Sequence, residues 1–171
     1  MAKRIYIFRH AKSDWGDPLL SDHDRLLSPR GERDAYRMGQ YFHANGLRWD
    51  AALISSSRRT MQTYEFLERG LEQMTVDPEI SGALYLASSD RILQLIHNQD
   101  ERANSLLLIG HNPGFHELAQ LLLKDAREGG EYAGKFPTAA LCVIDCDVDK
   151  WADVQPGCGR LALYTKPKAL A

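Results

Sequence analysis

The chain has 171 residues, of which 44% are hydrophobic and 26% are charged, so it suits one globular domain with a sizeable core over residues 1–171. The net charge is −2 and no Lys/Arg-rich tract is present, which argues against a nucleic-acid-binding surface because such surfaces concentrate positive charge. Composition therefore favours small molecules or proteins as partners.

The N-terminal segment combines basic residues with a very short apolar run, residues 4–8. That run is too short for a signal peptide or a membrane span, so we expect no membrane association and a cytoplasmic location. The run is typical of a buried strand, and Arg9 and His10 follow it directly.

Further along the chain, apolar runs alternate with longer stretches of helical periodicity. Strands are predicted over residues 4–8, 51–55, 106–110, 139–144 and 160–165, with a weaker one at 75–78. Helices are predicted over residues 28–45, where a serine N-cap precedes proline, and over about 58–73, 88–98 and 114–124. This alternation predicts an α/β domain with a largely parallel sheet.

Residues 124–137 are polar and rich in glycine, so they predict a surface loop. Such a loop could overhang a functional site, or it could simply connect two elements. The sequence leaves both interpretations open.

Cations or imidazoles follow three of the predicted strands. They are Arg9 and His10 after residues 4–8, Ser56, Ser57, Arg58 and Arg59 after residues 51–55, and His111 after residues 106–110. Ligands of open α/β sheets bind at the carboxyl ends of the strands, and helix N-termini favour anions. The pattern therefore predicts a site for a doubly charged oxyanion, with phosphate as the obvious candidate.

Each of these features also has a simpler explanation. Arg9 and His10 could be a solvated strand end, Arg58 and Arg59 could lie on a solvated helix face behind an N-cap, and His111 could be a core histidine. Their coincidence at three matching strand ends favours the oxyanion site.

Several segments resemble signatures of a known family. "FRHAKSDW", "SSSRRTMQT" and "IGHNPG" resemble, in order, the three motifs of the histidine phosphatase (phosphoglycerate mutase-like) superfamily, with Ala11 where the first motif has glycine. Together with "DHDRLLSPRGERDA", "LYLAS" and "FPTAAL", they are similar to the short SixA-type branch, named for phosphohistidine phosphatases. The resemblance implies a three-layer α/β/α fold that is phosphoglycerate mutase-like.

The resemblance also implies roles for particular residues. His10 would be the nucleophile that forms a covalent phosphohistidine, which water then hydrolyses. Arg9 and Arg59 would bind the phosphoryl oxygens, and His111 would donate a hydrogen bond to the same group. Arg58 would face solvent or substrate. No metal or other cofactor is implied.

The general acid is the main departure from the family pattern. Relatives that hydrolyse phosphomonoesters often place a carboxylic acid after the second helix, where this chain has Ala83. The candidate acids elsewhere are Glu79, Asp17, Asp14 and Asp90. An imidazole leaving group needs a strong acid less than an alkoxide does, so the missing acid favours substrates with a P–N bond.

The predicted function is hydrolysis of phosphohistidine in proteins through a covalent phosphohistidine intermediate. One alternative is a phosphatase of small phosphomonoesters, and another is a catalytically weak phosphate-binding module. The expected partner is accordingly a phosphorylated protein or a small phosphorylated substrate.

No metal site is predicted from the histidines or the cysteines. His111 and His116 are separated by Pro113 and Gly114, unlike the i, i+4 pairs of helical zinc sites. Cys142, Cys146 and Cys158 lack CxxC spacing and are expected to be reduced thiols. The other histidines, interpreted as surface or packing residues, are His23, His43, His97 and His116.

Overall fold

The computed structural model describes residues 2–73, 75–123 and 135–170. The strands are β1 (Lys3–Arg9), β2 (Ala51–Ser55), β3 (Glu79–Ser81), β4 (Ser105–Gly110), β5 (Leu141–Cys146) and β6 (Gly159–Thr165). The helices are α1 (Pro29–Ala44), α2 (Arg58–Leu71), α3 (Ser89–His97) and α4 (Gly114–Leu122). Short 3-10 turns are η1 (Asp22–Asp24), η2 (Gly82–Leu84), η3 (Trp151–Asp153) and η4 (Pro167–Ala169).

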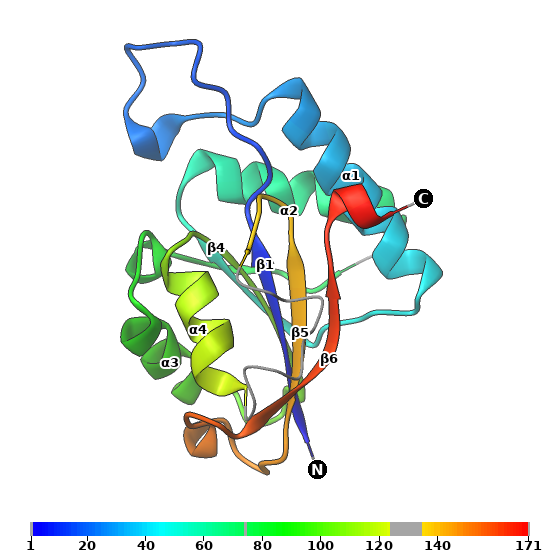
Figure 1. Cartoon of the computed structure of the whole chain (residues 1–171), viewed down its shortest axis with the longest axis vertical. Helices are drawn as coiled ribbons and strands as arrows, with labels where there is room; N and C mark the ends of the chain where they lie inside the picture. The colour runs from blue at the N-terminus through cyan, green and yellow to red at the C-terminus, as the bar shows by residue number, and fades with distance from the viewer. Residues whose placement is uncertain (1, 74, 124–134, 171) are drawn as a thin grey trace.

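The strands form a six-stranded sheet in the order β3-β2-β4-β1-β5-β6. The neighbours β3, β2, β4 and β1 pair in parallel, whereas β5 is antiparallel to both β1 and β6. The sheet is therefore largely parallel, as the sequence predicts. Because β4 lies between β1 and β2, the carboxyl ends of these three strands meet at one edge (Figure 1).

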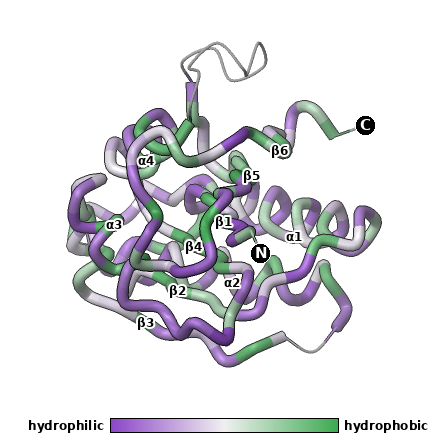
Figure 2. The backbone as a smooth tube through the Cα atoms, turned by 90° about the horizontal axis from the view of Figure 1, so that it is seen from below, coloured by the Kyte–Doolittle hydropathy of each residue, from purple (hydrophilic) through white to green (hydrophobic). Residues whose placement is uncertain are grey.

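Helices cover both faces of the sheet, and β1 shows why. Its alternate side chains Ile5 and Ile7 pack in the cluster that contains α3 and α4 residues, whereas Tyr6 and Phe8 pack in the cluster that contains α1 and α2 residues. The view along the strands shows the same three layers (Figure 2). The predicted three-layer α/β/α fold is confirmed. No helix in the described part of the chain is long and apolar enough to cross a membrane.

Helices α1 and α2 touch through their backbones. A Cβ on Gly39 would lie 2.1 Å from the carbonyl oxygen of Leu67, and a Cβ on Gly70 would lie 2.1 Å from that of Tyr36. Glycine at both positions lets the helices approach more closely than side chains would allow. This contact sets the position of α2, whose first turn carries Arg59.

Two strands differ from their predicted ranges. The weak strand predicted at 75–78 is wrong, because pairing with β2 begins only at Glu79, after Pro78, which has no N–H to donate. The strand predicted at 139–144 begins at Leu141, because Ala139 has a φ of 60° and cannot be extended. Of the predicted loop 124–137, residues 124–134 lie outside the described residues.

The three cysteines are thiols and not disulfides, as expected. Cys142 and Cys146 are buried in β5, and Cys158 is half-buried before β6. Burial raises the pKa of the Cys142 thiol to about 12, so this residue is an inert core side chain.

Candidate active site

A pocket of about 240 Å³ lies at the carboxyl ends of β1, β2 and β4. It is lined by Arg9, His10, Lys12, Ser13, Trp15, Asp22, Arg59, Leu86, His111, Asn112 and Thr138. The sheet thus brings together Arg9, His10, Arg59 and His111. Of the other residues singled out at the strand ends, Ser56, Ser57 and Arg58 do not line the pocket, and Arg58 is exposed. The candidate acids Glu79 and Asp17 do not line this pocket, and both are exposed.

His10 is held in one tautomer by the backbone. Its main-chain N–H donates to Gly110 at 3.0 Å, which continues the pairing of β1 with β4. The ring Nδ1 lies 2.7 Å from the carbonyl oxygen of Ala11, which can only accept, so Nδ1 carries the proton. In the neutral ring, Nε2 is therefore the nitrogen with a free lone pair.

The charge state of His10 follows from its surroundings. The residue is 8% exposed, and burial, together with the nearby positive charges of Arg59 and Arg9, lowers its pKa to about 4. The imidazole is therefore neutral at pH 7, the state in which Nε2 can act as a nucleophile.

Arg59 is buried in the first turn of α2 and makes three polar contacts. It donates from Nη1 to the Asp22 carbonyl at 2.6 Å, from Nη2 to the Asp22 carboxylate at 3.0 Å, and from Nη2 to His111 Nδ1 at 3.2 Å. The helix start is fixed locally, because Ser57 caps it and the Thr60 hydroxyl donates to the Ser55 carbonyl at 2.7 Å. Arg59 therefore enters the pocket from a rigid element.

His111 is held in the opposite tautomer to His10. Because a guanidinium can only donate, Nδ1 of His111 accepts from Arg59, and Nε2–H donates to the Ser55 hydroxyl at 2.7 Å. Burial, together with the nearby His10 and Arg59, lowers the pKa of His111 to about 3. This ring is therefore neutral at pH 7.

Arg9 borders the pocket from the end of β1. It donates from Nη1 to the Phe136 carbonyl at 3.1 Å, and Asn112 Nδ2 donates to the same oxygen at 2.8 Å. The Nε of Arg9 is buried and finds no hydrogen-bond partner within the described residues. An anion in the pocket is a natural partner for the donors of this side chain.

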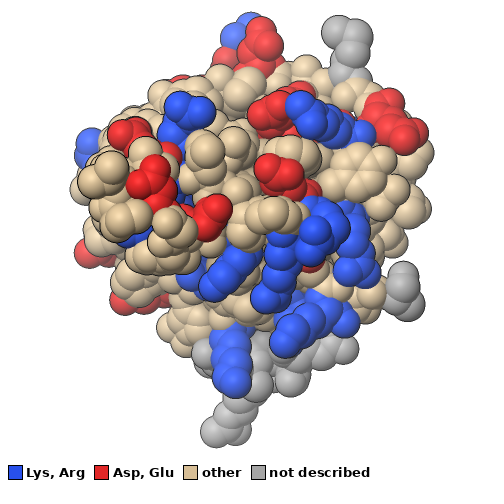
Figure 3. Space-filling model, turned by 90° about the horizontal axis from the view of Figure 1, so that it is seen from above, with Lys and Arg blue, Asp and Glu red and all other residues tan. Residues whose placement is uncertain are grey.

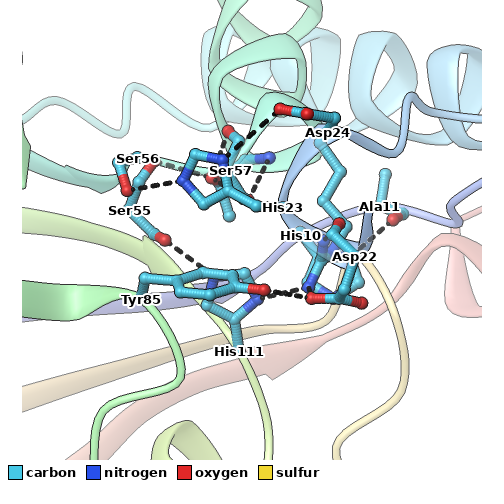
Figure 4. A network of polar contacts seen from close by, with 12 residues as sticks. His10, Ala11, Asp22, His23, Asp24, Ser55, Ser56, Ser57, Tyr85 and His111 are labelled. Atoms are coloured by element: carbon cyan, nitrogen blue, oxygen red, sulfur yellow. Dashed lines mark hydrogen bonds and ion pairs between the residues drawn. The ribbon is translucent and has the colours of Figure 1, made fainter. Parts of the chain in front are cut away.

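Asp22, the first residue of η1, and Tyr85, which directly follows η2, complete the site. The Tyr85 hydroxyl donates to the Asp22 carboxylate, and this hydrogen bond, together with Arg59, lowers the pKa of Asp22 (Figure 4). The Tyr85 ring also packs edge-on against His111, at 5.3 Å between ring centroids, and against His23, at 4.8 Å. His23 is hydrogen-bonded through Nε2 to Ser56 Oγ at 2.9 Å, so it packs at the edge of the site.

Three residues of this arrangement carry no local signal in the sequence. Asp22 and Tyr85 lie in the quoted segments 22–35 and 84–88, but periodicity assigns no role to side chains of irregular segments. Thr63, fully buried in α2, donates to the Arg59 carbonyl at 2.7 Å and accepts from the Ala11 N–H at 3.1 Å. It ties the segment after β1 to the helix that carries Arg59.

The arrangement is suited to a phosphoryl group. Among the described residues, two guanidinium groups, two neutral imidazoles and Lys12 line one small pocket, next to a single carboxylate, Asp22. Within residues 2–73, 75–123 and 135–170, no group of three or more His, Cys, Asp or Glu side chains is placed to hold a metal ion.

Comparisons with known proteins agree with this geometry. A family model described as "Histidine phosphatase superfamily (branch 1)" matches residues 5–85. An uncharacterized protein of Mycobacterium tuberculosis is 34% identical over 164 residues, which cover 94% of this chain and 99% of that protein.

Two solved structures are similar over nearly the whole chain. A protein of Nakamurella multipartitia, assigned as the phosphohistidine phosphatase SixA, has a TM-score of 0.85 and 25% identity, covering 99% of this chain and 98% of that one. A protein of Agrobacterium tumefaciens with the same assignment has a TM-score of 0.82 and 28% identity, covering 96% and 98%.

Proposed function

The chain belongs to the histidine phosphatase superfamily, in its SixA-type branch, and from that premise we propose that it removes phosphoryl groups from phosphohistidine in proteins. Family membership makes the chain a phosphatase. The substrate, the roles of the individual residues and the independence from metal ions are our proposal. The similarity to two proteins assigned as phosphohistidine phosphatases supports this choice of substrate.

The observation that carries the proposal is the state of His10. Its Nδ1–H is held by the Ala11 carbonyl, and its low pKa leaves Nε2 unprotonated at neutral pH. Nε2 attacks the phosphorus atom in line while the substrate imidazole departs, so one P–N bond forms as another breaks. Water then releases phosphate from His10.

Arg9, Arg59 and His111 stabilise the transferred phosphoryl group in this proposal. The guanidinium fork of an arginine matches phosphoryl oxygens in geometry and charge. When Arg59 turns to the phosphoryl group, His111 Nδ1 loses its donor, and the nearby dianion favours protonation of that nitrogen. His111 then donates a hydrogen bond to the charge that develops in the transition state.

The leaving group is the reason for preferring phosphohistidine over a phosphomonoester. In the part of the chain that the structure describes, Asp22 is the carboxylate that lines the pocket, and its lowered pKa keeps it ionised, so it is a poor proton donor. An alkoxide leaves badly without a proton, whereas an imidazole accepts one readily from water. Neither Glu79 nor Asp17 lines the pocket to supply the missing proton.

Trapping the covalent intermediate tests the proposal. The protein is mixed with a phosphohistidine peptide, quenched at alkaline pH, where a P–N bond survives, and analysed by tandem mass spectrometry. We expect phosphate on His10, no adduct in His10→Ala, and an unchanged adduct in the control His43→Ala, because His43 is exposed on α1.

Two results would contradict this mechanism. Phosphate on His111 would exchange the roles of the two histidines, and the absence of any adduct would favour direct attack by water. Hydrolysis of a sugar phosphate at a higher kcat/KM than the phosphohistidine peptide would instead favour the small-phosphomonoester alternative.

A further inference from the structure

A second groove adjoins the candidate active site. It has a volume of about 250 Å³ and is lined by Arg30, Asp34, Lys135, Pro137, Thr138, Lys166, Pro167 and Lys168, and we call it the basic groove. Thr138 lines both the basic groove and the catalytic pocket, so the two are neighbours. Lys and Arg side chains gather on this end of the molecule (Figure 3).

The charges of the basic groove are strongly unbalanced. Among the described residues, its four cations face one carboxylate, Asp34, which is largely buried and lies 3.5 Å from Arg30. Lys135, Lys166 and Lys168 form no ion pair with any residue in the described part of the chain. A chain with a net charge of −2 thus concentrates positive charge next to its catalytic pocket.

One wall of the basic groove is attached to the catalytic residues. The Lys135 carbonyl accepts a hydrogen bond from the Tyr164 hydroxyl at 2.8 Å, and the next carbonyl, that of Phe136, accepts from Arg9. The Ala139 N–H then donates to the His10 carbonyl at 3.0 Å. The segment that carries Lys135 is therefore held in a fixed position relative to His10.

We propose that the basic groove binds a carboxylate-rich segment of the protein substrate, next to its phosphohistidine; this inference rests on the proposed function. A phosphoryl group in the pocket leaves the flanking residues of the substrate over the adjoining surface. Unpaired lysines there attract acidic side chains and speed the encounter with an acidic partner. The basic groove thus selects protein substrates by charge, while the catalytic pocket binds only the phosphoryl group.

Hydrolysis of three synthetic phosphohistidine peptides tests this inference. The peptides are flanked by glutamates, by serines or by lysines, and kcat/KM is measured at low and high salt. We expect the wild-type protein to prefer the glutamate peptide to the serine peptide by roughly fivefold to thirtyfold at low salt, and less at high salt. Lys166→Glu with Lys168→Glu should abolish this preference and favour the lysine peptide over the glutamate peptide.

Arg48→Glu with Lys150→Glu is the matched control. Both residues are exposed at the opposite end of the sheet, before β2 and after β5, and the change in net charge is the same. We expect this variant to keep the wild-type preference. Equal rates for the glutamate and serine peptides in the wild-type protein, or a preference that survives the Lys166 and Lys168 reversals, would overturn the inference.

A binding measurement separates this inference from the proposed function. Fluorescence anisotropy of a labelled glutamate-rich peptide without phosphohistidine reports on the basic groove alone, and we expect binding that is lost with Lys166→Glu and Lys168→Glu. If no phosphohistidine peptide is hydrolysed, the proposed function fails. The anisotropy measurement still shows whether the basic groove binds a carboxylate-rich segment. Tighter binding of a single-stranded RNA at the same lysines would overturn the choice of an acidic protein segment.

Discussion

At the scale of single residues, Asp22 has two opposing effects on the candidate site. It holds the Arg59 guanidinium through its backbone carbonyl and its carboxylate, and so orients a residue that is predicted to bind phosphate. Its negative charge also lies in the pocket that has to receive a phosphoryl dianion. The hydrogen bond from Tyr85 keeps that charge in place, because it lowers the pKa of Asp22.

We expect Asp22→Asn to tighten the binding of inorganic phosphate. The asparagine oxygen can accept from Arg59 and Tyr85 as the carboxylate does, and the backbone contact is unaffected, so the geometry persists while the repulsion disappears. Removing a negative charge from the same pocket as a bound anion should improve the free energy of binding by about 1–2 kcal/mol, or roughly tenfold in Kd. Isothermal titration with phosphate measures the change.

Asp17→Asn is the control for this prediction, because it removes the same charge from an exposed side chain outside the pocket. Its phosphate affinity should match that of the wild-type protein. Weaker binding by Asp22→Asn would mean that the carboxylate acts mainly by orienting Arg59.

At the scale of elements, the site depends on the close contact of α1 with α2. Arg59 and Thr63 lie on α2, and Thr63 ties this helix to Ala11 after β1. The backbone contacts at Gly39 and Gly70 hold α2 at the distance at which these hydrogen bonds form. The position of Arg59, a predicted phosphate-binding residue, thus depends on a contact between helices outside the pocket.

Gly70→Ala tests this dependence. Its Cβ would meet the Tyr36 carbonyl oxygen, which belongs to the backbone of α1 and cannot rotate away, so the helices have to separate. We expect a loss of about 1–3 kcal/mol in the free energy of unfolding, as for other overpacked contacts, together with a lower kcat/KM. Urea unfolding and steady-state kinetics measure the two effects.

Gly82→Ala provides the comparison for Gly70→Ala. The new Cβ at Gly82 would lie 3.9 Å from the Ser56 hydroxyl, an ordinary contact, so we expect stability close to that of the wild-type protein. Equal stability of Gly70→Ala and the wild-type protein would show that the helix contact is not limiting.

At the scale of the whole molecule, the site lowers the stability of the fold in acid. The pKa values of His10 and His111 are about 4 and about 3 in the folded protein, below the ordinary value of 6.5. Above pH 6.5 both histidines are neutral in the folded protein and in the unfolded chain, so their titration does not affect stability. As the pH falls from 6.5 toward 4, the unfolded chain binds protons that the folded protein does not, so unfolding becomes easier.

We therefore expect His111→Gln to lose less stability in acid than the wild-type protein does. Each buried neutral histidine costs about 1.4 kcal/mol per pH unit within this window, and the variant lacks one of them. Urea unfolding at pH 7.5, 6 and 5 measures the difference. His43→Gln, at an exposed position, should follow the wild-type curve. If the free energies of unfolding of His111→Gln and of the wild-type protein differ by the same amount at all three pH values, the assignment of a neutral buried ring to His111 is contradicted.

Much of the fold could be predicted because its signals are local. The apolar runs of β1, β2 and β4 and the helical periodicity between them are properties of short segments, and they indicated the α/β class and the parallel sheet. β3 was misplaced because it begins where pairing with β2 becomes possible, directly after Pro78, and the partner strand cannot be read from a short apolar segment. The backbone conformation of Ala139 likewise delays the start of β5 to Leu141.

The sequence by itself determined that Arg9, His10, Arg59 and His111 follow the ends of strands, because residue type and local pattern are written along the chain. Only the tertiary structure decided that β4 lies between β1 and β2, which brings these side chains into one pocket. It also decided that Asp22, not Glu79 or Asp17, lies there, and that lysines from separate segments form the basic groove. Such groupings depend on strand pairing and on the path of irregular backbone, and neither leaves a periodic signal in the sequence.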